Sequence, residues 1–507
     1  MSDGSRRQFS SLSLTVYPKE VESEARVVKA PKLWPTIIQG GMGVGLSNWN
    51  LAKEVSRTGE LGVVSGTAVD TVIARRLQNG DEGGHIRRAL SHFPSQVIAE
   101  RILTRYFRAE PRKKDETYML VPKPSITPSR EALEIVIASN FVEVWLAKEG
   151  HEGIVGINYL EKIQMATAPA VLGAMLAGVD YILMGAGIPR EIPRLIREFA
   201  AGQAGSIHID VIGATDPHLL TVDPTEIFGD ELPVLKAPKF IAIVSTDILA
   251  SYLAKDEATK PDGFVVEGHR AGGHNAPPRG KMNLNESNEP IYGDRDEPNL
   301  AKMVALGTPF WLAGAYGHPD MVASALELGA QGVQVGTLFA LSEDSGLRAD
   351  IRNQLLREIG LDHLRVYTDP AASPTGFPIK VAQLEGTLSD GEVSENRYAL
   401  CDMGYLRTPF LNPNGRIDYR CAGEPADMYI KKGGNVEDLH GRECLCNGLT
   451  ANIGLGQHRR SGYDEPAIVT LGSDTEGTKI MLESYPQGFS AREAVEWLMR
   501  TKANLQK

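Results

Sequence analysis

The chain has 507 residues, enough for several ordinary domains or for one large domain with insertions. Hydrophobic residues make up 42% of it and charged residues 23%, so it can bury a large core. Its 53 basic and 64 acidic residues give a formal net charge of −11, which argues against nonspecific binding of nucleic acid or of an anionic membrane.

The N-terminal segment, MSDGSRRQFSSLSLTVYPKE, lacks the apolar core of a secretory signal peptide. No uninterrupted apolar run along the chain approaches the length needed to span a bilayer. We therefore expect a cytoplasmic protein without nucleic-acid or membrane partners. Residues 1–33 are expected to form an N-terminal extension.

Eight short apolar runs recur along the chain, with helical patterns such as 168–177, 299–306 and 319–328 between them. The expected strands are 36–39, 61–65, 154–158, 181–184, 240–244, 263–266, 310–313 and 332–339. This alternation predicts parallel strands, and eight units indicate an α/β fold of the (β/α)8 TIM-barrel type over residues 34–345. An open doubly wound sheet is the alternative.

The loop after the first expected strand reads Gln39-Gly40-Gly41-Met42-Gly43. Its glycine-rich backbone beside an apolar side chain suits the face of a planar ring. Leu46 stands where a dinucleotide-binding fingerprint needs its last glycine, so that fingerprint is absent. A Walker motif, H-E-x-x-H and G-x-S-x-G are absent as well.

Two intervals are longer than a barrel needs, and we expect inserted segments at about 70–150 and 200–235. They contain the apolar runs 118–121 and 207–212. These insertions could cover the barrel mouth, form oligomer contacts or add packing. A homo-oligomer is therefore left open.

The segment 263–274, GFVVEGHRAGGH, is a buried strand that ends in glycines, charges and two histidines. Gly272 and Gly273 let backbone N–H groups approach a ligand, at the strand end where α/β enzymes bind phosphates. A second buried strand ends in Gly336-Thr337, before a polar turn and an expected helix at 347–360. Either cluster alone could be a tight turn, but together they favour a phosphate-bearing cofactor.

Residues 346–507 follow the barrel as an irregular, turn-rich C-terminal lobe. All four cysteines of the chain lie there, at Cys401, Cys421, Cys444 and Cys446. Their Cys-x-Cys spacing is tighter than the Cys-x2-4-Cys spacing of zinc sites. We expect reduced thiols and no metal, with a metal or iron–sulfur site as the alternative.

Four motifs occur in an informative order: PTIIQGGM at 35–42, AGGH at 271–274, LAG at 312–314 and GVQVGT at 332–337. They resemble the nitronate monooxygenase family, formerly called 2-nitropropane dioxygenases, over roughly residues 34–345. The resemblance implies an FMN-dependent (β/α)8 barrel. Segments 74–78 and 83–90 are similar to a longer subgroup, related to the trans-acting enoyl reductases of polyunsaturated-fatty-acid synthases.

The resemblance also implies roles for individual residues. The loop after the first strand would lie against the flavin, Asn158 near its ring and ribityl chain, and the later glycines at its phosphate. The residues expected to bind the cofactor are Gly41, Met42, Gly43, Ser65, Asn158, Glu267, Gly272, Gly273, Gly314, Gly336 and Thr337. His274 matches the active-site histidine of the family. The chain departs from the family at Glu267, where Gln is common, at Arg270, where Glu is usual, and at 240–245, which lacks a lysine.

A histidine at the end of a strand also suits the expected chemistry. The cofactor transfers electrons, so the protein must handle a proton or a developing negative charge. Imidazole titrates near neutral pH, and His274 could therefore deprotonate an acidic carbon or stabilise a nitronate. His269 is the rival candidate.

The leading hypothesis is an FMN-dependent, nitronate monooxygenase-like oxidoreductase. It would oxidise alkyl nitronates, which are small molecules, with O2 to a carbonyl compound and nitrite. One alternative is an FMN-dependent NAD(P)H enoyl-thioester reductase. It would meet an acyl carrier protein or a nicotinamide nucleotide through Arg75, Arg76, Arg87, Arg88 and Arg270. Another is a noncatalytic flavin- or metal-binding partner in a larger assembly.

Overall fold

A computed structural model describes residues 34–113 and 115–500, so the expected N-terminal extension, 1–33, lies outside the described residues. Its central sheet has eight strands in the order β1-β10-β9-β8-β7-β4-β3-β2, and all of them pair in parallel. The strands are β1 (Ile37–Gln39), β2 (Gly62–Ser65), β3 (Val155–Leu160), β4 (Tyr181–Gly185), β7 (Lys239–Val244), β8 (Gly263–Glu267), β9 (Phe310–Ala313) and β10 (Gly332–Val335).

The two end strands of this sheet meet. The Gln39 N–H donates to the Leu61 carbonyl at 2.9 Å, and the Leu61 N–H donates to the Ile37 carbonyl at 3.1 Å. The sheet therefore closes on itself. The predicted (β/α)8 barrel is confirmed, and the open-sheet alternative does not describe this fold.

Side chains alternate across the barrel wall, as the period of a strand requires. Ile38, Val265 and Trp311 belong to a buried cluster that fills the inside. Their sequence neighbours, such as Ile37 and Val266, belong to the larger cluster between the strands and the helices. The same alternation directs polar residues at the carboxyl ends of the strands into the barrel mouth.

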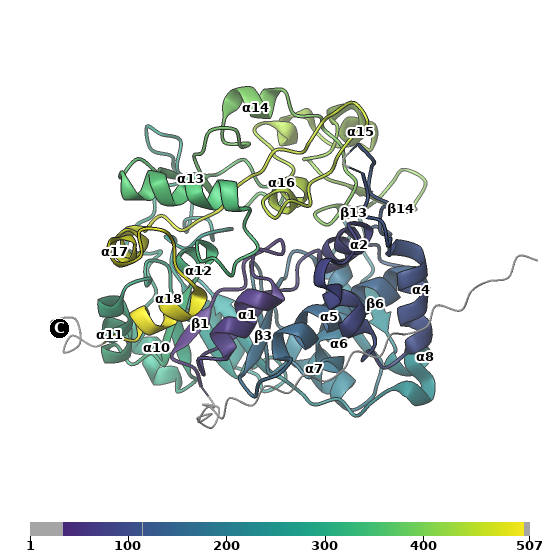
Figure 1. The fold of residues 1–507 in the computed structure, drawn as a ribbon, viewed down its shortest axis with the longest axis horizontal. Helices are drawn as coiled ribbons and strands as arrows, with labels where there is room; N and C mark the ends of the chain where they lie inside the picture. The colour runs from purple at the N-terminus through teal and green to yellow at the C-terminus, as the bar shows by residue number, and fades with distance from the viewer. Residues whose placement is uncertain (1–33, 114, 501–507) are drawn as a thin grey trace, which may run out of the picture. The chain divides into compact units, whose positions relative to one another are not determined.

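Helices cover the outside of the barrel (Figure 1). They are α1 (Trp49–Ser56), α5 (Arg130–Lys148), α6 (Gln164–Leu176), α7 (Ile192–Ala200), α9 (Asp247–Ala254), α10 (Leu300–Leu306) and α11 (Pro319–Glu327). The expected helices at 168–177, 299–306 and 319–328 correspond to α6, α10 and α11. N-capping side chains mark the starts of several helices. The Asn299 side chain, for example, accepts the Lys302 N–H at 3.1 Å at the start of α10.

One of the expected strands is shorter in the structure. The run 332–339 was expected to be a single strand, but β10 ends at Val335 and α12 (Thr337–Ala340) follows. Leu338 and Phe339 are buried in the larger hydrophobic cluster instead of the sheet. A short buried helix and a buried strand have the same apolar composition, so periodicity could not separate them here.

Inserted segments occupy both long intervals. The first contains α2 (Val69–Gln78), η1 (Glu82–Gly84), α3 (His85–Leu90) and α4 (Gln96–Tyr106), and its apolar run 118–121 has no regular structure. The second contains the hairpin of β5 (Gly205–Ile209) and β6 (His218–Val222), then α8 (Pro224–Phe228) and η2 (Gly229–Glu231). In the described part of the chain, no helix is both long and apolar enough to cross a membrane.

The chain after the barrel has short elements joined by long loops. They are α13 (Ala349–Gly360), β11 (Val366–Asp369), β12 (Ile379–Ala382), α14 (Gly391–Glu395), β13 (Thr408–Leu411), β14 (Ile417–Arg420), α15 (Ala426–Lys431), η3 (Val436–Leu439), α16 (Leu445–Ala451), α17 (Glu476–Ser484) and α18 (Ala491–Leu498). The expected helix at 347–360 corresponds to α13. Strands β11 and β12 form one antiparallel pair, and β13 and β14 form another.

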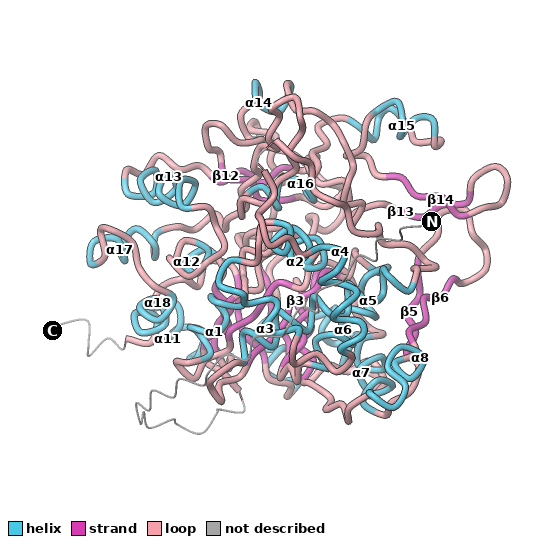
Figure 2. The backbone as a smooth tube through the Cα atoms, turned by 45° about the vertical axis from the view of Figure 1, so that its right-hand side comes forward, coloured by secondary structure: helices cyan, strands magenta, loops and turns pink. Residues whose placement is uncertain are grey.

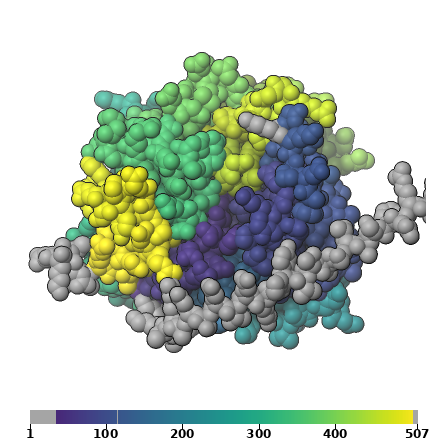
Figure 3. All heavy atoms as spheres, viewed as in Figure 1, coloured from purple at the N-terminus to yellow at the C-terminus, as the bar shows by residue number. Residues whose placement is uncertain are grey.

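This C-terminal part packs closely against the barrel. Helices α17 and α18 lie beside α11 and α12, whereas β12 and α16 lie above the strands (Figures 1 and 2). Met481 and Trp497 belong to the same hydrophobic cluster as barrel residues. In the space-filling view, the green and yellow C-terminal residues form the top of the molecule and one flank (Figure 3). A domain boundary at residue 345 stays a prediction.

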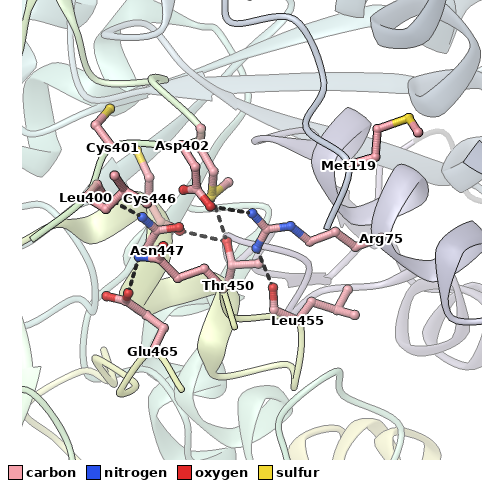
Figure 4. A network of polar contacts seen from close by, with 12 residues as sticks. Arg75, Met119, Leu400, Cys401, Asp402, Cys446, Asn447, Thr450, Leu455 and Glu465 are labelled. Carbon is pink, nitrogen blue, oxygen red and sulfur yellow. Dashed lines mark hydrogen bonds and ion pairs between the residues drawn. The ribbon is translucent and has the colours of Figure 1, made fainter. Parts of the chain in front are cut away.

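A buried polar network joins the first insertion to the C-terminal part (Figure 4). The Arg75 guanidinium, in α2, donates to the Leu455 carbonyl at 2.6 Å and pairs with Asp402 at 3.1 Å. Nearby, the Tyr405 hydroxyl donates to Asp70, whose pKa burial raises to about 6. Arg75 is therefore a structural residue that no external partner can reach.

Candidate active site

A cavity of about 620 Å³ opens at the carboxyl ends of the strands. This volume lies within the usual range for a cofactor or ligand site. The cavity gathers all the site residues expected from the sequence except Ser65: Gly41, Met42, Gly43, Asn158, Glu267, Gly272, Gly273, His274, Gly314, Gly336 and Thr337. Ser65 is buried behind the first loop, where its hydroxyl accepts the Thr67 N–H at 3.4 Å.

The cavity pairs a glycine-rich backbone with inward-facing amide side chains. A Cβ at Gly41 would lie 2.3 Å from the Asn158 Cβ, so only glycine fits there. The Asn158 amide donates to the Gly41 carbonyl at 3.1 Å, while its Oδ1 is buried without a hydrogen-bond partner. Gln334 Oε1, another cavity residue, is also buried and unpaired. Because such acceptors are costly to leave unpaired, both residues fit a ligand that carries N–H donors.

The cavity also contains a tight backbone cradle. A Cβ at Gly272 would lie 2.8 Å from the Leu471 carbonyl carbon and 2.9 Å from the Gly472 nitrogen. Gly314 has φ +91° and backbone atoms of the loop after β8 at 3.1 Å from its Cβ position. The Gly472 N–H donates to the Thr337 hydroxyl at 2.9 Å. Closely packed glycine backbone of this kind suits a phosphate group.

The last residue of β8 and the loop after it each contribute an ionisable group to the cavity. Burial raises the pKa of Glu267 to about 7. Burial, and then the charge of Lys162, lower the pKa of His274 to about 4. The His274 Nε2 lies 2.7 Å from the Ser373 hydroxyl. The expectation that His274 titrates near neutral pH is therefore wrong, because the C-terminal part and Lys162 keep its imidazole neutral.

A second cavity, of about 240 Å³, adjoins the first. Its apolar wall includes Ile188, Leu249 and Phe377, and it shares Ala186, Ile243, Glu267 and His274 with the large cavity. His269 lines only this second cavity. Its ring stacks on Tyr292 at 4.5 Å between centroids, and its Nδ1 lies 3.6 Å from Glu297.

Two parts of the site were not expected from the sequence. Residues 470–472, 474 and 476–478 line the large cavity although they lie far beyond the barrel strands, and nothing in their sequence marks them as functional. Gln334 could have been found, because it is the polar residue on the inward face of the otherwise apolar strand β10. The candidate site is thus built from both the barrel and the C-terminal part.

The four cysteines lie apart from both cavities and are free thiols. The Asn447 amide donates to the Leu400 carbonyl at 3.1 Å (Figure 4). It also donates to the Cys444 sulfur at 3.6 Å. Burial raises the pKa of Cys444 to about 11, so this thiol is protonated near neutral pH. Within residues 34–113 and 115–500, no group of three or more ligating side chains is arranged to hold a metal ion.

Residues 225–374 match the family model described as nitronate monooxygenase. The family resemblance is confirmed. The matched segment spans β7 to β10 and contains Glu267, His274 and Thr337, and the family is one of oxidoreductases. The match also supports a flavin cofactor. The closer likeness to the trans-acting enoyl reductases stays a prediction.

The chain is also similar to several solved structures. FabK from Thermotoga maritima has 14% identity and a TM-score of 0.45, with 92% of this chain and 91% of that chain covered. A nitroalkane oxidase from Streptomyces ansochromogenes has 12% identity and a TM-score of 0.44, with 93% and 96% covered. The enoyl reductase domain of MlnA from Bacillus amyloliquefaciens has 14% identity and a TM-score of 0.38, with 71% and 66% covered. These likenesses are too weak to indicate a function, and no curated protein matches the sequence.

Proposed function

We propose that the protein is an FMN-dependent oxidoreductase that oxidises alkyl nitronates with O2. Overall, two nitronates and one O2 would give two carbonyl compounds and two nitrite ions. The large cavity carries this proposal, because it combines a glycine cradle with two unpaired acceptors, Asn158 Oδ1 and Gln334 Oε1. A bound flavin supplies the electron transfer, and the protein supplies binding, orientation and electrostatics.

The lining residues fit a flavin mononucleotide. Gly272, Gly314 and Thr337, with their neighbours Gly273 and Gly336, would hold its single phosphate. The first loop, with Met42, would lie against the ring, and the two unpaired amide oxygens would accept hydrogen bonds from the ring N–H and from the ribityl hydroxyls. A single compact cradle and the absent dinucleotide fingerprint favour FMN over FAD.

The charges near His274 suit an anionic substrate. Lys162 lies near enough to lower the pKa of His274, and the Arg270 side chain lines the large cavity. A neutral imidazole can donate one hydrogen bond to the nitro oxygens of a nitronate and keep it in place. We therefore assign His274 to charge stabilisation and substrate orientation.

The enoyl-thioester reductase alternative is less well supported than nitronate oxidation, because most of the arginines that it would use are already paired. Arg75 is buried in its pair with Asp402, and the other three arginines of the first insertion also pair with carboxylates: Arg76 with Glu143, Arg87 with Asp81 and Arg88 with Glu149. Of the five arginines considered for an acyl carrier or a nicotinamide nucleotide, Arg270 is the one that lines the large cavity.

The test is to purify the protein, denature it and identify the released flavin, then mix the holoprotein anaerobically with a preformed alkyl nitronate or with NAD(P)H. We expect FMN, a change in the flavin spectrum with the nitronate, and nitrite formation once O2 is admitted. Reduction by NAD(P)H alone would favour the enoyl reductase. A colourless protein that cannot be reconstituted with FMN would refute the proposal.

A further inference from the structure

Glu267 stands where the two cavities meet. We propose that its carboxylate removes the α-proton of a neutral nitroalkane, so that the protein generates its nitronate in place. This inference rests on the proposed function, and it assigns to Glu267 the proton removal that the sequence alone assigned to His274. The small cavity would hold the alkyl part of that substrate.

The position of Glu267 follows from the pleat of β8. It is the last residue of the strand, and it faces inward like Val265, two residues before it in the barrel interior. It lines both cavities, with Ile243 and His274 in the shared wall. In the described part of the chain, no hydrogen bond or ion pair to its carboxyl group is found. A group placed this way can contact a molecule that lies across the two cavities.

The surrounding charges leave Glu267 free to exchange a proton. On its own loop, His274 is neutral near pH 7, and burial lowers the pKa of His269, which lies beside Glu297. The other ionisable groups that line the two cavities are Tyr159, Arg270, Arg279, Tyr292, Asp296, Tyr316, His318, Asp320, Asp474 and Glu476. Only burial, and no charged neighbour, shifts the pKa of Glu267, which is raised to about 7. A pKa near the working pH is favourable for a general base.

His274 is the weaker base of the two. With its pKa lowered to about 4, its protonated form would be too acidic to hold a proton taken from carbon. Glu267 and His274 therefore have different roles: the carboxylate accepts the proton, and the imidazole orients the anion that forms.

The proposed step is a simple proton transfer. The C–H bond next to the nitro group breaks, a carboxyl O–H bond forms on Glu267, and the electron pair of the C–H bond moves onto the nitro group. The resulting nitronate is then oxidised as proposed above. The wall of the second cavity, with Ile188, Leu249 and Phe377, suits an alkyl chain, and its volume is about 240 Å³.

The decisive experiment compares Glu267→Gln with the wild-type holoprotein on a freshly dissolved neutral nitroalkane and on its preformed nitronate. A positioned acid–base group contributes about 10²- to 10⁴-fold in rate. We expect Glu267→Gln to lose kcat/KM by such a factor on the neutral form and by a much smaller factor on the nitronate, with both rates normalised to the measured FMN content. Glu267→Asp should recover part of the loss. The matched control is Glu297→Gln, a carboxylate in the loop beside His269, which should leave both rates unchanged.

The pH profile gives a second readout that needs no variant. For the neutral substrate, kcat/KM of the wild type should rise as pH increases through about 7, because only the carboxylate form accepts a proton. A flat profile, unaltered activity of Glu267→Gln, or an equal loss on both substrate forms would overturn the inference. If the wild type neither binds flavin nor oxidises the nitronate, the proposed function itself is refuted. Failure of the proposed function can therefore be distinguished from failure of the Glu267 assignment.

Discussion

Replacing Gly272 by alanine tests whether the C-terminal segment is a wall of the cofactor site. The new Cβ would lie 2.8 Å from the Leu471 carbonyl carbon, whereas ordinary contacts begin at 3.4 Å. The backbone near Leu471 must therefore retreat by about 0.6 Å, which is 3.4 minus 2.8. Gly472, which donates to the Thr337 hydroxyl, would move with it. Overpacking of this kind costs roughly 1–3 kcal/mol. If that cost falls on the ligand-bound state, FMN affinity drops by roughly 5- to 150-fold.

The assay is a fluorescence titration of the apoprotein with FMN. Gly268→Ala is the matched control, because it changes the same loop and its Cβ would meet only the Ala313 carbonyl oxygen, at an ordinary 3.7 Å. We expect the control to bind FMN like the wild type. If a folded Gly272→Ala protein also binds FMN as tightly as the wild type, the cradle is not where the phosphate binds.

Three further predictions concern other parts of the molecule. His274→Asn should keep FMN bound and slow turnover of both the neutral nitroalkane and the nitronate by similar factors, because a neutral imidazole stabilises charge. Initial rates on both substrate forms test this, and His269→Ala should lower these rates less. Cys444→Ser should leave FMN content unchanged, because this thiol lines neither cavity. Stoichiometric zinc or iron that is lost together with folding would contradict that reading. Arg75→Met should lower the free energy of unfolding by about 3–5 kcal/mol, because it leaves a buried carboxylate unpaired. Arg88→Met, at a more exposed ion pair, should cost about 1 kcal/mol or less in the same urea titration, and equal losses would contradict the assignment.

The sequence was informative where the signal is local. Short β-branched runs followed by glycines predicted the strands and the loops at their carboxyl ends, because alternation and chain reversal depend on neighbouring residues. The glycine-rich loops at Gly41, Gly272 and Gly336 could therefore be predicted from the sequence alone. The run 332–339 shows the limit of this reasoning, since burial of Phe339 does not reveal whether a strand or a helix buries it.

Contacts between distant segments could not be predicted. The C-terminal part is held over the barrel by loops without periodicity, so no pattern indicated that residues 470–472, 474 and 476–478 would line the cavity. For the same reason the pKa of His274 could not be inferred, because it depends on burial and on the charge of Lys162, more than a hundred residues earlier in the chain. An imidazole at a strand end open to water would keep its ordinary value.

The barrel and the C-terminal part together determine the acid–base character of the site. The Lys380 N–H donates to the Gly273 carbonyl and the Asn275 N–H donates to the Pro378 carbonyl, each at 2.9 Å, so β12 and the residue before it hold the loop that carries His274. Burial favours the uncharged form of any ionisable group, and it therefore shifts a carboxyl and an imidazole in opposite directions. The pKa of Glu267 rises to about 7 and that of His274 falls to about 4, which reverses their usual order. Burial, together with the charge of Lys162 near His274, thus makes the carboxylate, and not the histidine, the stronger base in this cavity.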